Sequence, residues 1–308
     1  MGDAWTVDRI GDLSGRVAIV TGGSSGIGLE TARELARHGT YAVLACREEA
    51  RAENAIRSIR EEVPGAKVEW LLLDLASLRS VRNFAEAFNA RFDRLDLLVN
   101  NGGIMLVPYG RTEDGFERHF GTNHLGHFAL TGLVVDRLVA TSASCIVTVT
   151  SAAYRFGRLD FENLMYTNGV GYTPFGAYAR SKLANLLFAE ELDRRLQGTE
   201  ARSVAAHPGG AATNLGRRAT ERRIYGTLLP IFERLSQSAT QAARSVLRAA
   251  TDPNVRGGEL YGPGGRLGMK GPPVLLPPKP IATDEAIARR LWSACEELTG
   301  VRYPSPGG

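Results

Sequence analysis

A tyrosine and a lysine four residues apart are the side chains of this chain best suited to proton transfer. Tyr178 and Lys182 lie in the segment Tyr-Ala-Arg-Ser-Lys, within a pattern typical of a helix, and the spacing places them on one face of it. A free tyrosine is a poor acid or base at neutral pH because its pKa is about 10. A neighbouring cation favours the phenolate and lowers that pKa, so the pair could exchange a proton with a substrate oxygen.

Lysine is rare in this chain, which makes the lysine of the pair informative. The sequence has 37 basic residues, and the four lysines among them are Lys67, Lys182, Lys270 and Lys279. Where nearly every cation is an arginine, a lysine at position 182 indicates a need for a compact ammonium that a guanidinium does not replace. The alternative is a solvated helix face, because this spacing also arises often by chance.

A glycine-rich segment indicates a second kind of chemistry, the binding of phosphate. Thr-Gly-Gly-Ser-Ser-Gly-Ile-Gly spans residues 21–28, between a buried strand pattern and a helix pattern. Glycines there allow a tight turn and the approach of a pyrophosphate, to which the helix N-terminus offers free N–H groups. An ordinary strand-to-helix turn is the alternative. The residues expected to bind a dinucleotide here are Gly22, Ser24, Ser25, Gly26, Ile27 and Gly28.

The end of the second strand pattern bears on which dinucleotide binds. An acid about twenty residues past the glycines would accept a hydrogen bond from the ribose of NAD. Cys46 occupies that place here and Arg47 follows it. Because a guanidinium can hold a 2′-phosphate with two hydrogen bonds, the sequence favours NADP(H) over NAD(H). Glu48 and Glu49 lie just beyond and weaken this preference.

Strand-like apolar runs alternate with helical patterns along the chain. The alternation predicts a single doubly wound (Rossmann-type) α/β domain over residues 1–308, with a parallel sheet of about seven strands and helices on both faces. The expected strands are 17–21, 41–46, 68–73, 95–99, 145–150, 203–207 and 259–261. The expected helices are one ending near residue 37, then 48–63, 77–91, 112–138, 174–196, 221–235, 239–250 and 282–298.

Three segments are expected to border a substrate site, at about residues 155–175, 214–231 and 262–280. Eleven of the nineteen residues in the last segment are Gly or Pro, which predicts a packed loop at a pocket rim or a subunit contact rather than a regular element. The segments carry apolar side chains, which suggests an apolar compound; closure of the core or a dimer contact is the alternative. These side chains are Leu164, Met165, Phe175, Ile224, Leu228, Leu229 and Met269.

Composition argues against several other classes of protein. The formal net charge is +4, but the arginines are dispersed, and no nucleic-acid partner is expected. The three cysteines, Cys46, Cys145 and Cys295, are too few and too far apart for a disulfide framework or a zinc site, and fit a reducing, cytoplasmic setting. The N-terminal residues lack the pattern of a signal peptide, and no apolar run is long enough for a membrane span. His124 and His127 lack a third ligand at suitable spacing, so packing is expected rather than a metal site.

Taken together, these residues resemble the short-chain dehydrogenase/reductase family over about residues 12–300. Besides the glycine segment and the Tyr/Lys pair, the motifs that occur in the family's order are Asp74-Leu75, Asn100-Asn101-Gly102-Gly103, Ser151 and Pro208-Gly209. The sequence of residues 123–128, Asn-His-Leu-Gly-His-Phe, is most similar to that of the retinol dehydrogenases and WW-domain oxidoreductases. Protochlorophyllide reductases are also similar but carry a cysteine where this chain has Ala184. The family usually has alanine where this chain has Gly102.

The resemblance implies a role for each matching residue. Tyr178 would be the general acid/base, Lys182 would lower its pKa and bind the nicotinamide ribose, Ser151 would hold the substrate oxygen, and Asn123 would hold a water that links Lys182 to solvent. In the cofactor site, Asp74 would bind the adenine amino group with Leu75 beside it. The adenine ribose would lie against Asn101, Gly102 and Gly103, and the nicotinamide against Pro208, Gly209 and Thr213. Plainer roles remain as alternatives, such as a strand-end cap for Ser151 or a helix N-terminal acid for Asp74.

These observations favour an NADP(H)-dependent oxidoreductase that transfers hydride to or from the carbonyl or alcohol carbon of an apolar substrate. A cofactor-binding sensor or scaffold of the same fold, with little turnover, is the alternative from another class. A homo-oligomer is compatible with the sequence. The sequence does not identify the substrate.

Overall fold

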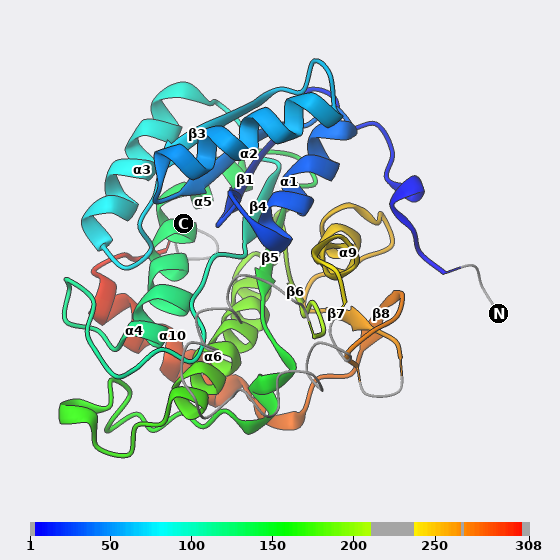
Figure 1. The fold of residues 1–308 in the computed structure, drawn as a ribbon. Helices are drawn as coiled ribbons and strands as arrows, with labels where there is room; N and C mark the ends of the chain where they lie inside the picture. Colours follow the sequence, from blue (N-terminus) through cyan, green and yellow to red (C-terminus); the bar gives the residue numbers. More distant parts are fainter. Residues whose placement is uncertain (1–3, 211–236, 266–267, 304–308) are drawn as a thin grey trace, which may run out of the picture.

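The computed structural model describes residues 4–210, 237–265 and 268–303 of the 308-residue chain. The predicted helix at 221–235, the proposed rim segment 214–231 and Thr213 lie outside these ranges. In the described part, one sheet lies between two layers of helices (Figure 1).

The sheet has eight strands in the order β3-β2-β1-β4-β5-β6-β7-β8. The first seven are parallel, and β8 is antiparallel to β7. Strand order reverses between β1 and β4, and in such sheets ligands bind beyond the carboxyl ends of the strands at this point. The strands are β1 (Val17–Thr21), β2 (Tyr41–Cys46), β3 (Val68–Leu72), β4 (Leu97–Asn100), β5 (Cys145–Val149), β6 (Arg202–Ala206), β7 (Leu260–Pro263) and β8 (Pro273–Leu276).

Helices cover both faces of the sheet, as the alternating pattern predicts. One face packs against α1 (Gly26–Arg37), α2 (Glu49–Glu62) and α9 (Ala239–Thr251). The other packs against α3 (Leu78–Arg91), α5 (Gly126–Val139), α6 (Pro174–Arg195) and α10 (Glu285–Thr299). The shorter elements are α4 (Arg118–Phe120), the π-helical turn η2 (Gly121–Leu125) and the 3₁₀ turns η1 (Val7–Arg9), η3 (Ala152–Phe156), η4 (Thr167–Gly169) and η5 (Pro280–Ala282).

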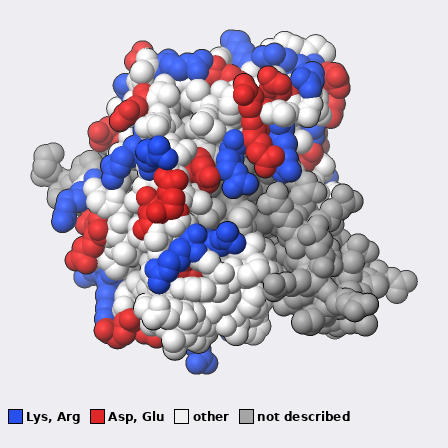
Figure 2. Space-filling view, turned by 60° about the vertical axis from the view of Figure 1, so that its left-hand side comes forward, with Lys and Arg blue, Asp and Glu red and all other residues white. Residues whose placement is uncertain are grey.

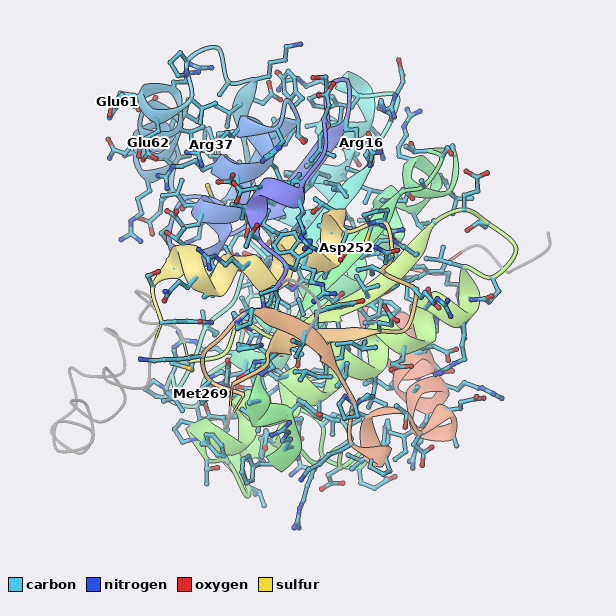
Figure 3. All side chains as sticks on the ribbon, turned by 90° about the vertical axis from the view of Figure 1, so that its right-hand side faces the viewer. Arg16, Arg37, Glu61, Glu62, Asp252 and Met269 are labelled. Atoms are coloured by element: carbon cyan, nitrogen blue, oxygen red, sulfur yellow. The ribbon has the colours of Figure 1, made fainter. Side chains whose placement is uncertain are left out.

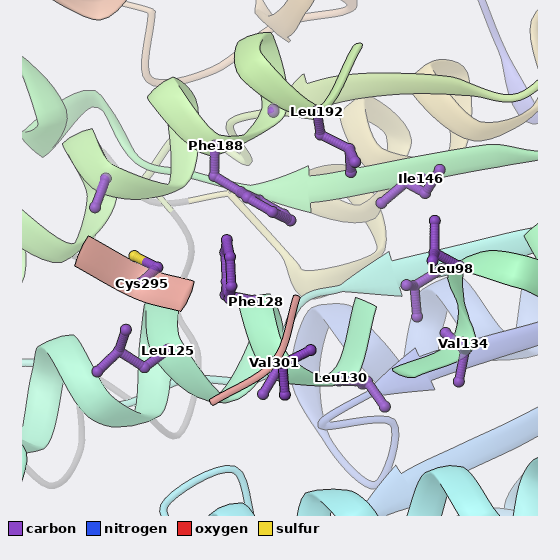
Figure 4. Packing of buried hydrophobic residues seen from close by; sticks show 14 of the residues in the cluster. Leu98, Leu125, Phe128, Leu130, Val134, Ile146, Phe188, Leu192, Cys295 and Val301 are labelled. Carbon is purple, nitrogen blue, oxygen red and sulfur yellow. The ribbon is translucent and has the colours of Figure 1, made fainter. Parts of the chain in front are cut away.

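Two hydrophobic cores form because side chains alternate across each strand. In β1, Ile19 enters the core shared with α3, α5, α6 and α10, whereas Ala18 and Val20 enter the core shared with α1 and α9. Figure 4 shows the first core, where Leu98 and Ile146 of the sheet face side chains of the helical layer. Burial of an aliphatic side chain contributes roughly 1.5–3 kcal/mol, so these two cores dominate the stability of the domain.

Charges on the described surface are mixed in sign. On the face in Figure 2, the Lys and Arg side chains are interspersed with Asp and Glu. Figure 3 labels Arg37 of α1 and Glu62 of α2, whose side chains approach to 3.8 Å. Exposed pairs of this kind contribute at most about 1 kcal/mol each. The helices are therefore held mainly by their buried faces.

The structure corrects two features predicted from the sequence. Residues 262–280 are not simply loop, because β7 continues to Pro263 and residues 273–276 form β8. The helix predicted at 112–138 begins only at Arg118 and is interrupted by the π-helical turn η2. Gly115 adopts a φ of 85°, which a helix does not accommodate. None of the described helices combines the length and apolarity needed to cross a membrane.

Candidate active site

The predicted site residues within the described ranges gather at the carboxyl end of the sheet. The loop after β1 carries the glycine segment, the end of β4 carries the Asn-Asn-Gly-Gly segment, and Ser151 follows β5. Helix α6 begins at Pro174, with Thr173 as its N-cap accepting from Gly176 N, and it brings Tyr178 and Lys182 to the same edge. The parallel arrangement of the strands is what brings these distant segments together.

Two loops meet closely enough to exclude side chains at the glycine positions. Gly22 has a φ of 66°, and a Cβ there would lie 2.9 Å from the Cα of Gly102. A Cβ on Gly28 would lie 2.5 Å from the carbonyl oxygen of Gly22. Thr21 Oγ1 joins the loops by accepting hydrogen bonds from the N–H groups of Asn101 and Gly102, each at 2.8 Å. A side chain at either glycine would therefore disrupt the contact between the loops.

The N-terminus of α1 is suited to an anion. Its N-cap residue, Ser25, makes no capping hydrogen bond with its side chain, so the first N–H groups of the helix are not satisfied in that way. These donors lie beside the glycine turn and at the positive end of the helix dipole. Ser24 is close by and lies near the Cys46 thiol. The glycine cradle and the helix terminus together fit a pyrophosphate.

Arg47 lies at the end of β2, where the cofactor's 2′ group was expected. Its side chain is 55% exposed, and it lies 3.9 Å from the Asp74 carboxylate and 3.7 Å from that of Glu48. The guanidinium is therefore available to a phosphate, but two acids compete for it.

Asp74 and Leu75 are placed by the turn that leads into α3. Asp74 Oδ1 accepts from the N–H of Ala76 at 3.0 Å, whereas Ser77 is the N-cap and accepts from Ser80 N. Asp74 is therefore not the capping acid of this helix. Leu75 is buried, and its Cδ1 lies 2.8 Å from where a Cβ on Gly102 would stand. The family's alanine at position 102 would thus touch the end of the Leu75 side chain, which can move aside at little cost.

Ser151 and Tyr178 lie together at the same edge of the sheet. Ser151 is the N-cap of η3, and its hydroxyl accepts from Ala153 N at 3.3 Å. The same side chain lies near the phenol of Tyr178. Burial raises the pKa of Tyr178, and the neighbouring Ser151 hydroxyl lowers it by less. The capping role and the contact with Tyr178 therefore coexist.

Lys182 is nearly enclosed, with 5% of the residue exposed. Its ammonium donates to the carbonyl oxygen of Val149 at 3.0 Å and lies 5.9 Å from the centroid of the Tyr178 ring. Burial lowers the pKa of Lys182 to about 8. This differs from the expectation that the lysine holds the phenol pKa down, because at this separation burial dominates at Tyr178.

Asn123 lies in the π-helical turn η2, and its side chain is fully engaged by the protein. Oδ1 accepts from Ile104 N at 2.8 Å, while Nδ2 donates to the Ile104 carbonyl and to Ser181 Oγ, each at 3.0 Å. Its main-chain carbonyl accepts from His127 Nδ1 at 2.9 Å. Asn123 thus ties the loop after β4 to α6. Gly103 lies against it, since a Cβ there would be 2.9 Å from Asn123 Oδ1.

The turn after β6 completes the described site. Gly209 has a φ of 74°, and its N–H donates to His207 Nδ1 at 3.0 Å. The carbonyl of Pro208 accepts from Gln237 Nε2 at 2.6 Å. Gly210 N donates to the carbonyl of Met269, which Figure 3 labels beside the β7–β8 hairpin. The third rim segment therefore touches the predicted nicotinamide side of the site.

The structure adds a buried pair that the sequence did not single out. Glu117 and His119 are both fully buried, and Glu117 Oε1 lies 3.0 Å from His119 Nδ1. The His119 ring packs edge-on against Tyr178, with centroids 6.2 Å apart. The spacing of Glu117, His119 and Tyr178 along the sequence does not indicate this contact.

His124 and His127 are both buried. Burial lowers the pKa of His124 to about 4 and that of His127 to about 3, so both are neutral at pH 7. Within the described ranges, no cluster of three or more His, Cys, Asp or Glu side chains could hold a metal ion.

Comparisons with known proteins agree with this geometry. The short chain dehydrogenase family model matches residues 16–224. Retinol dehydrogenase 13 of Homo sapiens is 42% identical over 302 residues, covering 95% of this chain and 87% of its own length. The WW domain-containing oxidoreductase of Homo sapiens is 40% identical over 304 residues, covering 96% and 71%. A solved structure of an uncharacterized protein from Mycobacterium paratuberculosis has a TM-score of 0.81 at 39% identity, covering 98% of this chain and all of that one.

The dinucleotide cradle, the Tyr-x-x-x-Lys pair and these relatives lead to one conclusion. The chain belongs to the short-chain dehydrogenase/reductase family, whose members are NAD(P)-dependent oxidoreductases acting on alcohol and carbonyl groups.

Proposed function

We propose that the protein is an NADP(H)-dependent oxidoreductase for an apolar aldehyde, ketone or alcohol, with Tyr178 as general acid/base. The observation that carries the proposal is the contact between the Tyr178 phenol and the Ser151 hydroxyl, close to the buried ammonium of Lys182. A phenol, a hydroxyl and a cation together can hold a carbonyl oxygen and supply the proton that its reduction requires.

When bound, the dinucleotide supplies a hydride to the carbonyl carbon, or accepts one in the reverse direction. Ser151 donates a hydrogen bond to the substrate oxygen, and the phenol of Tyr178 gives that oxygen its proton as the carbonyl becomes an alcohol. The positive charge of Lys182 then stabilises the phenolate until a proton arrives from solvent. In oxidation, Tyr178 takes the proton from the alcohol instead.

The glycine cradle and Arg47 support NADP(H) as the cofactor. Gly22, where the loops approach closely, and the uncapped N-terminus of α1 form a turn of the kind that binds a pyrophosphate. Arg47 would hold the 2′-phosphate, and the nearby Asp74 carboxylate would bind the adenine amino group.

Apolar side chains at the rim support an apolar substrate. Phe156 and Phe175 are 69% and 46% exposed, and their ring centroids lie 5.8 Å apart. Leu164 and Met165, by contrast, close the core: Leu164 is buried in the core shared with α5, α6 and α10, and Met165 packs against it. Relatives named retinol dehydrogenase at about 40% identity are consistent with this substrate class.

The test is a panel of aldehydes and ketones of rising alkyl length, assayed with NADPH. We expect kcat/KM to rise with apolar size, and we expect Tyr178→Phe to lower kcat by roughly 10²–10⁴-fold while NADPH still binds. Tyr41→Phe is the matched control, since Tyr41 lies at the other end of the sheet and its hydroxyl bonds Glu69 at 2.9 Å.

Activity confined to sugars or carboxylates would contradict the substrate class. Full activity in Tyr178→Phe would contradict the assignment of the acid/base. Tight NADPH binding without turnover of any carbonyl compound would instead favour a cofactor-binding sensor.

A further inference from the structure

A chain of hydrogen bonds runs from the C-terminal helix α10 to the ammonium of Lys182. Cys295 Sγ of α10 lies 3.2 Å from His124 Nε2, and His124 Nδ1 lies 3.2 Å from Asn185 Oδ1. Asn185 Nδ2 donates to the carbonyl oxygen of Val149 at 3.1 Å, and the same oxygen accepts from Lys182 Nζ at 3.0 Å. The hydrogen bonds thereby join five residues, which come from η2, α6, β5 and α10.

The acceptor at one end fixes the direction of each bond. A carbonyl oxygen only accepts, so the Asn185 amide must present its NH₂ group to Val149 and its oxygen to His124. His124 then carries its proton on Nδ1, which leaves the lone pair on Nε2 to accept from the Cys295 thiol. All donors and acceptors along the chain are consistent with one neutral tautomer.

The network is shielded from water. Cys295, His124 and Asn185 are each at most 1% exposed. Figure 4 shows Cys295 on α10 near Leu125, Phe128 and Phe188. The His124 ring also packs against Phe120 and Phe188, at centroid distances of 5.0 and 6.1 Å. In such surroundings a misplaced polar group finds no substitute partner, so the chain is held in one arrangement.

We propose that Cys295 and His124 are positioning residues that set the place of the Lys182 ammonium through Asn185 and the Val149 carbonyl. The proposal rests on the proposed function, in which Lys182 acts on Tyr178. Val149 ends β5 two residues before Ser151, and Thr150 Oγ1 donates to the Lys182 carbonyl at 2.7 Å. The carbonyl oxygen of Val149 therefore lies between Ser151 and Lys182, whose relative position must be maintained.

The groups that face Lys182 come from three directions. Tyr178 lies on its own helix, and His124 and His127 lie on η2 and α5. Cys295 of α10 is connected to Lys182 through His124. Burial keeps the pKa of the Cys295 thiol well above the usual range. Both histidines are neutral at pH 7, so Lys182 is the group of this network that titrates nearest to neutral pH.

The experiment compares Cys295→Ala with Cys145→Ala. Both cysteines are fully buried, and both variants lose the same atom, but Cys145 lies at the opposite end of β5 and its thiol faces the carbonyl of Ala249 at 3.6 Å. We expect Cys295→Ala to lower kcat by about fivefold, the effect of one lost hydrogen bond, and to move the basic limb of the oxidation profile to higher pH. Cys295→Ser, which keeps a donor, should restore both.

Two further variants keep the proposal testable if Cys295→Ala folds poorly, which its melting temperature would reveal. Asn185→Leu removes the amide between His124 and Val149 and should shift the pH profile in the same direction. His124→Asn keeps an amide donor where Nδ1 stands but has no atom in place of Nε2, so it cuts the contact with Cys295 and should shift the pH profile as Cys295→Ala does. Retention of the parent profile in either variant would overturn the proposed chain.

The outcomes separate this inference from the proposed function. If Cys295→Ala and Cys145→Ala have the same kcat and the same pH profile, Cys295 is structural only and the inference is wrong, even though Tyr178→Phe is inactive. If Tyr178→Phe remains active, the proposed function itself is wrong, whatever the cysteine variants show.

Discussion

The ammonium of Lys182 and the carbonyl oxygen of Val149 are 3.0 Å apart in a place almost without water. One carbonyl does not replace the hydration of a full charge, which is why the pKa of Lys182 falls from 10.5 to about 8. The lysine is thus held 5.9 Å from the centroid of the Tyr178 ring at a cost to the stability of the fold.

This cost can be measured with Lys182→Met. Below pH 8 the folded protein must keep the buried ammonium, whereas between pH 8 and 10.5 the folded state releases its proton before the unfolded state does. The parent therefore gains stability across that window. At pH 7 we expect the methionine variant to be more stable by up to roughly 3 kcal/mol, with the gap closing towards pH 10.5. A variant that is less stable at pH 7, in urea unfolding, would contradict this.

Cofactor preference should depend on Arg47. We expect the parent to bind NADPH more tightly than NADH, and Arg47→Ala to lose roughly 1–3 kcal/mol of NADPH binding with little change for NADH. Arg51→Ala is the control, because Arg51 is similarly exposed and pairs with Glu48 one turn along. Titration of both cofactors by fluorescence decides the matter, and equal affinities in the parent would refute the preference.

The two buried histidines should make the protein sensitive to acid. Their folded-state pKa values, about 4 for His124 and about 3 for His127, lie below the usual 6.5. Unfolded chains therefore take up these protons first, and the stability present above pH 6.5 is lost as the pH falls towards those values. We expect His127→Gln, which cannot titrate, to flatten the fall in unfolding free energy between pH 6.5 and 4. Parallel curves for parent and variant would show that His127 is not responsible.

Arg180 should control the order of the rim segment. Its guanidinium donates to the carbonyls of Arg158, Asn163 and Leu164 at 2.7–3.0 Å and lies 3.9 Å from the centroid of the Tyr166 ring. A lysine offers neither the fork nor the stacking plane. We expect Arg180→Lys to raise KM for the carbonyl substrate severalfold and to expose residues 158–166 to proteolysis. Arg194→Lys on the same helix, where the side chain pairs with Glu191 near the surface, should leave both unchanged.

Much of the fold and of the site follows from local patterns. The strands at 17–21, 41–46 and 145–149 are continuous apolar runs, and the spacing of Tyr178 and Lys182 needs only the periodicity of a helix. The glycine turn could be located because it stands between such a strand and a helix.

Other features depend on contacts that spacing does not encode. The π-helical turn at Asn123 widens a helix whose apolar pattern is otherwise regular, so nothing in that pattern indicates the turn. The glycines and prolines of residues 262–280 do not predict a strand. β8 forms there because it pairs with β7, not because of its own strand propensity. The contact of Cys295 with His124 joins residues far apart in the chain, and only the packing of α10 brings them together.

The strand at the end of the sheet is flanked by prolines, which limits pairing along its edge. Pro272 and Pro273 precede the core of β8, and Pro277 and Pro278 follow it, so only a short stretch of this edge has N–H groups to donate. A neighbouring chain cannot extend the ladder past residues that lack the donor. The same prolines that hide the strand from sequence analysis thus protect its exposed side from edge-to-edge aggregation.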